Sequence, residues 1–263
     1  MRDWEKHFKE FNDLLREIAS EKSSREAKLR FNCSFVKASD IAEQYFCEKK
    51  LDMQYLHGRV ETEEKSLGAE AHEKLLEDTT RVRIKDLWQM IYGKKPIFVH
   101  EMLIFAKYKE VALAGIPDCI LFVNGFPKII FEYKFSKRGT IFNTYQVQVR
   151  TYGILLGHVG FDVSRLYCAV VVAEPGARHD KKLKDKVVNE ITKNGPKEGV
   201  LIVSGAKIYI WKFDGVKAEQ DLDWALRFWK KQREAIPTEN LNKCASCEYS
   251  SECREPDQQR TLN

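Results

Sequence analysis

The strongest constraint on the fold is a series of short apolar runs between residues 98 and 173, each of the length of a β-strand. FVHEMLIFA, VALAG, DCILFVN and KIIFEYKF follow one another across short turns such as Asn124-Gly125, a dipeptide typical of tight hairpins. A longer helical pattern, IFNTYQVQVRTYGILLG, and a buried-looking strand, LYCAVVVA, come next. This order predicts a meander of three or four strands that continues into a mixed α/β sheet.

Helical patterns surround these strands. Apolar residues recur with helical spacing over residues 2–19, and a Ser/Lys-rich stretch that reads as a linker follows. Further helices are expected for DIAEQYFCEKKLDMQYL, for about 63–78 and near 180–194, before a final hairpin, VLIVSG/KIYIWKF. Helices before, between and after the strands predict one α/β domain whose sheet is covered on both faces. We expect residues 1–30 to be an accessory helix and linker, and 31–263 to be the main domain.

Composition narrows the class of protein. The chain is 43% hydrophobic and 32% charged, and its apolar runs are far shorter than the roughly 20 residues of a membrane span. The amino-terminal sequence lacks the uninterrupted apolar stretch of a secretory signal, so we expect a cytoplasmic protein. A net charge of +5 is compatible with a phosphate-bearing partner, although 39 acidic residues dilute it.

A carboxylate and lysine motif is the most informative candidate site. Asp118 begins one strand, and Glu132-Tyr133-Lys134 lies within the next, where alternation puts Glu132 and Lys134 on one face. A hairpin between the strands can bring Asp118 beside Glu132. Two carboxylates and the Tyr133 backbone carbonyl then offer hard oxygen ligands to Mg²⁺ or Mn²⁺. Lys134 would polarise the attacking water or offset charge in the transition state.

The same motif has a simpler interpretation. Glu-x-Lys on a strand is most often a solvated face with a weak ion pair. Here the neighbours in KIIFEYKF are strongly apolar, so charged groups there need a partner or a task.

Other polar residues could join this site. His72 follows Gly68 by four residues on an expected helix, so the two share one face. A lone histidine is more often structural than catalytic, but in combination with the Asp…Glu-x-Lys set His72 becomes a candidate third metal ligand. The helix after the strands carries amide, phenol and guanidinium groups that can contact DNA phosphates or bases, with ordinary surface positions an equal alternative. These residues are Gln148, Tyr152, Tyr145 and Arg150.

Seven cysteines in an intracellular chain favour metal ligation over disulfides. Cys244, Cys247 and Cys253 place three thiolates within reach of one centre. Among the remaining cysteines we choose Cys47, which lies beside basic residues on an expected helix, as the fourth ligand. Four thiolates fit either structural zinc or a [4Fe-4S] cluster, and the single distant cysteine favours iron and sulfur.

Together these motifs resemble a known family, the CRISPR-associated Cas-four nucleases, a RecB-like branch of the PD-(D/E)XK superfamily with an iron-sulfur cluster. The matching segments occur in the family's order over about residues 38–253. They are Ser39-Asp40-Ile41 through Cys47, Gly68-x3-His72, Gly115-Ile116-Pro117-Asp118, Glu132-Tyr133-Lys134, Gln148-x3-Tyr152 and the cysteine trio.

The resemblance implies a restriction-endonuclease-like core and an iron-sulfur module formed by segments of about 39–57 and 241–254. It also implies an exonuclease preferring single-stranded DNA, with or without endonuclease activity. His72, Asp118, Glu132 and the Tyr133 carbonyl would hold Mn²⁺ or Mg²⁺, and Lys134 would be catalytic. Members of the family trim spacer precursors with the CRISPR adaptation integrase. The open alternatives are a stand-alone repair nuclease, a mobile-element nuclease and a catalytically silent DNA-binding subunit.

Overall fold

A computed structural model describes residues 3–21, 29–59, 83–180 and 182–253 of the chain. Its centre is a mixed sheet in which six strands have the order β2-β5-β6-β7-β9-β8. Neighbouring strands pair antiparallel except β6 and β7, which are parallel. The strands are β2 (Ile97–His100), β5 (Cys119–Val123), β6 (Phe126–Phe135), β7 (Tyr167–Ala173), β8 (Gly199–Val203) and β9 (Ala206–Lys212).

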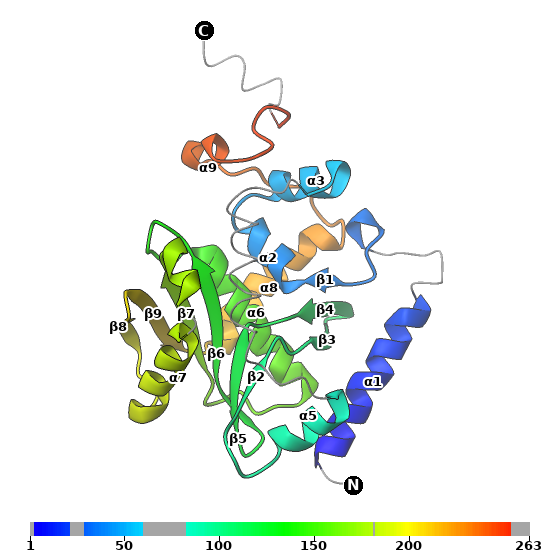
Figure 1. Cartoon of the computed structure of the whole chain (residues 1–263). Helices are drawn as coiled ribbons and strands as arrows, with labels where there is room; N and C mark the ends of the chain where they lie inside the picture. Colours follow the sequence, from blue (N-terminus) through cyan, green and yellow to red (C-terminus); the bar gives the residue numbers. More distant parts are fainter. Residues whose placement is uncertain (1–2, 22–28, 60–82, 181, 254–263) are drawn as a thin grey trace.

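Helices cover both faces of this sheet (Figure 1). One face packs on α6 (Asn143–Val159) and, behind it, α8 (Gly215–Trp229), whereas the other packs on α7 (Leu183–Asn194). The buried strand β7 is apolar on both sides because each face is covered. Helix α6 ends at Gly160, whose φ of 105° is the left-handed conformation that glycine provides after a helix. The predicted α/β class, with its mixed and doubly covered sheet, is confirmed.

The predicted meander is wrong in one respect. FVHEMLIFA forms two strands, β2 and β3 (Ile104–Tyr108), because the backbone turns at Glu101, where φ is 48°. β3 leaves the main sheet and joins β4 (Val111–Gly115) and the short β1 (Val36–Lys37) in a three-stranded sheet of order β1-β4-β3. Both halves of the run are apolar, so strand periodicity alone does not reveal the change of sheet.

The predicted helix DIAEQYFCEKKLDMQYL is also divided. It forms α2 (Ala38–Gln44) and α3 (Glu48–His57), and Cys47 between them is extended, with φ −171° and ψ 124°. The Lys243 ammonium donates to the carbonyls of Tyr45 and Phe46, which satisfies groups that a continuous helix would have bonded internally.

The remaining elements lie around this core. The predicted amino-terminal helix is α1 (Asp3–Glu21), and the helix expected at about 63–78 lies outside the described residues. Sequence analysis did not identify α5 (Ile84–Ile91), α8, α9 (Leu241–Ala245) or the 3-10 helices η1 (Arg30–Asn32) and η2 (Pro175–His179). Within the part of the chain that the structure describes, no helix has the length and apolarity needed to cross a membrane.

Candidate active site

The candidate site lies where β5 begins and β6 approaches its carboxyl end. Cys119 pairs with Phe131, so extending the same register by one residue sets Asp118 opposite Glu132. The Asp118 carboxylate accepts a hydrogen bond of 2.6 Å from the backbone N–H of Tyr133. The hairpin therefore brings both carboxylates to one place.

Alternation along β6 separates the side chains. Ile130 packs among residues of α6, whereas Phe131 and Tyr133 pack among residues of β7 and α7. Glu132 and Lys134 consequently face α6, and the Tyr133 ring faces the opposite side. The Glu132 side chain is only 3% exposed, so this carboxylate is held almost entirely out of water.

Lys134 connects Glu132 to α6. Its ammonium donates to Glu132 Oε1 at 2.7 Å and to the side-chain oxygen of Gln148 at 3.1 Å. Burial lowers the pKa of Lys134, but the carboxylates of Glu132 and Asp118 raise it more, so its pKa lies above the usual value. Lys134 is therefore a cation and a hydrogen-bond donor at neutral pH.

Tyr152 orients Gln148 through a hydrogen bond. Gln148 donates to the Tyr152 hydroxyl at 2.7 Å, and that hydroxyl donates to the Ile116 carbonyl at 3.3 Å. Burial and the two nearby carboxylates hold the pKa of Tyr152 well above its usual value, so the phenol keeps its proton. Gly115 makes room for the ring, because a Cβ there would lie 2.7 Å from Tyr152 Cδ1.

Two of the expected DNA contacts need correction. The Arg150 side chain is only 7% exposed and forms an ion pair with Asp221 of α8 at 2.7 Å, so it joins two helices inside the protein. Tyr152 is 2% exposed and acts on Gln148 instead of reaching the surface. Tyr145 and Gln148 are half-buried beside Lys134, whose ammonium lies 5.3 Å from the centre of the Tyr145 ring.

The third expected metal ligand, His72, lies outside the described residues, as does Gly68. Within the described ranges, no three His, Cys, Asp or Glu side chains are grouped so that they could hold a metal ion. The described part of the site therefore supplies the two carboxylates and Lys134. Sequence reasoning missed His100 of β2. Its ring nitrogen lies 3.2 Å from the Asp118 carbonyl oxygen.

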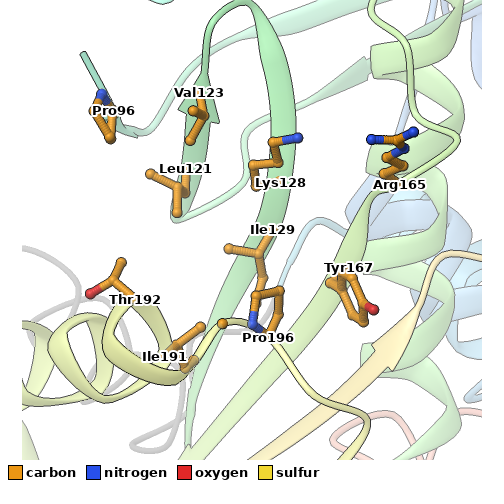
Figure 2. A pocket seen from close by; sticks show the side chains of 11 residues that line it. Pro96, Leu121, Val123, Lys128, Ile129, Arg165, Tyr167, Ile191, Thr192 and Pro196 are labelled. Atoms are coloured by element: carbon orange, nitrogen blue, oxygen red, sulfur yellow. The ribbon is translucent and has the colours of Figure 1, made fainter.

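A cavity of about 410 Å³ is lined by side chains of β5, β6 and α7, among others (Figure 2). Leu121, Ile129 and Ile191 line it on the α7 side of the sheet, together with Pro96 and Pro196. Ile129 precedes Glu132 by three residues, or about 10 Å along a strand, and faces the other side. The cavity is therefore separate from the candidate active site.

The four candidate cysteine ligands come from two segments that lie far apart in the sequence. Cys47 lies between α2 and α3, and Cys244, Cys247 and Cys253 follow in and after α9. Burial raises the pKa of the Cys253 thiol, and the neighbouring Cys47, Cys247 and Cys244 raise it further. The four thiols are thus close enough for their charges to interact, although their sulfur atoms do not converge on one metal position.

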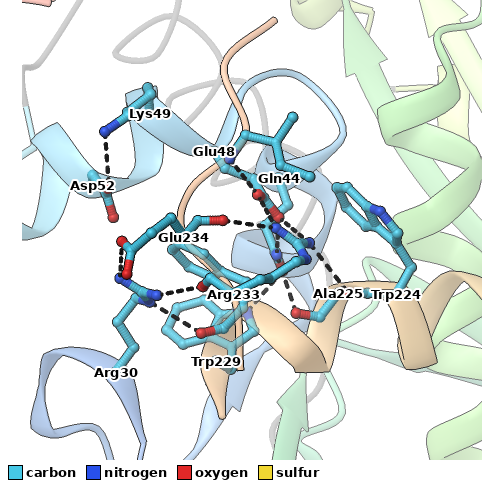
Figure 3. A network of polar contacts seen from close by, with 12 residues as sticks. Arg30, Gln44, Glu48, Lys49, Asp52, Trp224, Ala225, Trp229, Arg233 and Glu234 are labelled. Atoms are coloured by element: carbon cyan, nitrogen blue, oxygen red, sulfur yellow. Dashed lines mark hydrogen bonds and ion pairs between the residues drawn. The ribbon is translucent and has the colours of Figure 1, made fainter. Parts of the chain in front are cut away.

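Several contacts dock this carboxyl-terminal segment on α3. The Tyr249 hydroxyl donates to the Gly58 carbonyl at 2.6 Å, and Lys50 pairs with Glu248 at 3.3 Å. Figure 3 shows a further anchor, in which the buried Glu48 carboxylate accepts from Arg233 and Gln44. The backbone N–H of Ile236 also donates to Glu48, so the chain leading to the cysteine trio is fixed beside Cys47.

Comparison with known proteins agrees with this arrangement. A mixed sheet with helices on both faces and an Asp…Glu-x-Lys motif at a strand end defines a nuclease-type α/β core. The chain matches the PD-(D/E)XK nuclease superfamily over residues 5–254 and belongs to it. Nucleases of this superfamily use divalent metal ions.

Curated relatives match a short segment. Mitochondrial exonuclease V of Candida albicans is 43% identical over 47 residues, and that of Candida dubliniensis is 36% identical over 44 residues. These segments are 18% and 17% of this chain but 7% of each relative, so the match spans a small part of those proteins. The solved structure of SSO0001 has a TM-score of 0.46 at 13% identity, over 91% of this chain and 93% of that one.

Proposed function

We propose that this protein is a metal-dependent deoxyribonuclease in which Asp118 and Glu132 hold the metal ion and Lys134 assists the reaction. The observation that carries the proposal is the Lys134 ammonium, which bridges Glu132 and Gln148 beside the Asp118 carboxylate. This arrangement pairs oxygen ligands with one fixed cation, and phosphodiester hydrolysis needs both.

The donor set fits Mg²⁺ or Mn²⁺. Two carboxylates are hard oxygen ligands, and the Tyr133 carbonyl lies on the same edge of β6 as its N–H, which points at Asp118. His72 would complete the set from outside the described residues. When bound, the metal lowers the pKa of a water molecule and polarises a phosphoryl oxygen.

The chain's own groups have separate tasks. Lys134 donates a hydrogen bond toward the negative charge that develops on the scissile phosphate. Gln148 holds the Lys134 ammonium in place, and Tyr152 holds Gln148. The half-buried Tyr145 ring beside Lys134 offers a surface on which a DNA base can stack.

The finer assignment is an exonuclease that prefers single-stranded DNA. The names of the curated relatives and the order of the sequence motifs support exonuclease activity. A role in spacer processing beside the CRISPR adaptation integrase rests on those motifs alone, and a repair nuclease is the alternative.

We further propose that Cys47, Cys244, Cys247 and Cys253 hold a [4Fe-4S] cluster, with zinc as the alternative. Electrostatic contact among the four thiols and the docking of their segment on α3 support a shared centre. The cluster would join segments almost 200 residues apart, worth roughly 5 kcal/mol by the loop-closure estimate for cross-links.

Cleavage of single-stranded and duplex DNA with Mn²⁺ or Mg²⁺ tests the nuclease proposal. Asp118→Asn and Glu132→Gln should each abolish cleavage while DNA binding and folding persist. Asp86→Asn is the matched control, because Asp86 is exposed on α5 and pairs with Arg83 at the surface. Wild-type protein that binds DNA but never cuts it with any divalent metal would favour a silent DNA-binding subunit.

A further inference from the structure

The edge strand β8 presents consecutive apolar side chains to solvent. Val200, Leu201 and Ile202 are 55%, 36% and 72% exposed, although they lie within a regular strand. β8 pairs with β9 on one side, and among the described residues no strand pairs with its other side. Leaving this much apolar surface in water is unfavourable, and the open backbone groups of an edge strand invite another strand.

The usual protections of an edge strand are missing from β8. Its sequence, GVLIV, contains no proline and no charged residue, and its register with β9 runs through five pairs without a bulge. An incoming strand would therefore meet neither a clash nor a charge, and its own residues should be uncharged as well.

The hairpin fixes which backbone groups are open. Ser204 and Gly205 form a two-residue turn with φ values of 50° and 81°, and Val203 and Ala206 close it. A closing pair of this kind exchanges both backbone hydrogen bonds, so Leu201 also bonds with Ile208. Alternation then leaves the N–H and C=O groups of Val200 and Ile202 pointing away from β9.

We propose that this edge pairs with the same edge of a second copy, forming a two-fold symmetric dimer with one continuous sheet. In the antiparallel register that fits the open groups, Val200 faces Ile202 of the second copy and exchanges both hydrogen bonds with it. Leu201 of one copy lies opposite Leu201 of the other, at the two-fold axis. The strand is thus its own complement, and a two-fold contact closes after two chains.

Charge favours the same arrangement. Lys207 pairs with Ile202 and shares its face, whereas Glu198 lies beyond the opposite end of β8. The two-fold axis brings Glu198 of one copy near Lys207 of the other. The two residues are then separated by about two strand spacings across the sheet and two residues along it. Long side chains of opposite charge can approach there. Because one short strand buries a small interface, we expect micromolar affinity.

Molecular mass in solution tests the dimer. Wild-type protein at high micromolar concentration should have the mass of two chains, and Ile202→Lys should halve that mass while leaving nuclease activity per chain intact. Val216→Lys is the matched control, because Val216 is as exposed as Ile202, at 68%, but belongs to α8 and not to β8. A monomeric wild type, or a dimer that Ile202→Lys leaves unchanged, would overturn the proposal.

Cysteine cross-linking tests the register independently of activity. At the axis the two Leu201 Cα atoms would be about 4.5 Å apart, within the range of a disulfide. Two Val200 side chains would be diagonal neighbours about 7–8 Å apart, beyond that range. Under mild oxidation Leu201→Cys should give a covalent dimer, with Val200→Cys and the wild type as controls for the native cysteines. Equal cross-linking of all three would refute this register.

Discussion

Glu48 and Arg233 lie 185 residues apart in the sequence and form an ion pair in which two nitrogens of a half-buried guanidinium contact one buried carboxylate. Glu48 follows Cys47 directly, and Arg233 begins the segment that leads to the cysteine trio. The pair therefore holds the segment of Cys47 against the segment that leads to the cysteine trio. Trp229 and Gln44 extend the same network through a hydrogen bond of 2.7 Å.

Arg233→Ala should lower the free energy of unfolding by about 3–5 kcal/mol, because it leaves the Glu48 charge buried without its cation. Urea denaturation measures the loss. Lys6→Ala is the control, since Lys6 is exposed and its pairing with Glu10 at 3.9 Å is a surface contact. Equal stability of both variants would show that the buried pair does not anchor the carboxyl-terminal segment.

Gly115→Ala should disturb the candidate active site by displacing Tyr152. The added Cβ would lie 2.7 Å from Tyr152 Cδ1, so the ring must move and Gln148 loses its support. We expect a stability loss of about 1–3 kcal/mol from overpacking and a reduced rate of DNA cleavage. Gly176→Ala meets no atom within 4 Å and should alter neither. Identical behaviour of the two variants in thermal unfolding and cleavage assays would contradict this account.

The pH dependence follows from the raised pKa of Lys134. Its stabilising contribution is fully present below the unfolded-state pKa of about 10.4 and is lost only as the pH rises through the higher folded value. Cleavage should therefore show no alkaline decline from Lys134 below about pH 10. A decline near pH 8 that disappears in Lys134→Arg would mean that Lys134 loses its proton near pH 8, which contradicts a raised pKa.

Local sequence was sufficient for the centre of the site. Asp118 and Glu-x-Lys lie on strands joined by one hairpin, so alternation and a short turn determine which side chains meet. Local sequence could not predict which side chains of α6 are buried. Whether Arg150 reaches DNA depends on Asp221, which lies 71 residues later on a helix that the sequence did not reveal.

Long-range contacts explain the other differences from the predictions. The helix expected across Cys47 breaks where Lys243 caps the carbonyls of Tyr45 and Phe46, from 198 and 197 residues away. The split of FVHEMLIFA depends on which sheet each half joins, a choice made by packing and not by periodicity. The Glu48–Arg233 pair likewise has no local sequence signal, because each partner alone resembles a surface residue.

The proposed cluster gives the last prediction. Protein purified without oxygen should be brown and contain iron and sulfide, and Cys47→Ala should lose both the colour and the iron. Cys33→Ala is the control, because Cys33 lies before β1 and contacts the Phe31 carbonyl. Loss of the cluster opens the long loop, so Cys47→Ala should also be several kcal/mol less stable, on the order of the 5 kcal/mol expected for such a cross-link. A colourless wild type with one bound zinc would assign the four thiols to zinc, and one with no metal would remove the shared centre altogether.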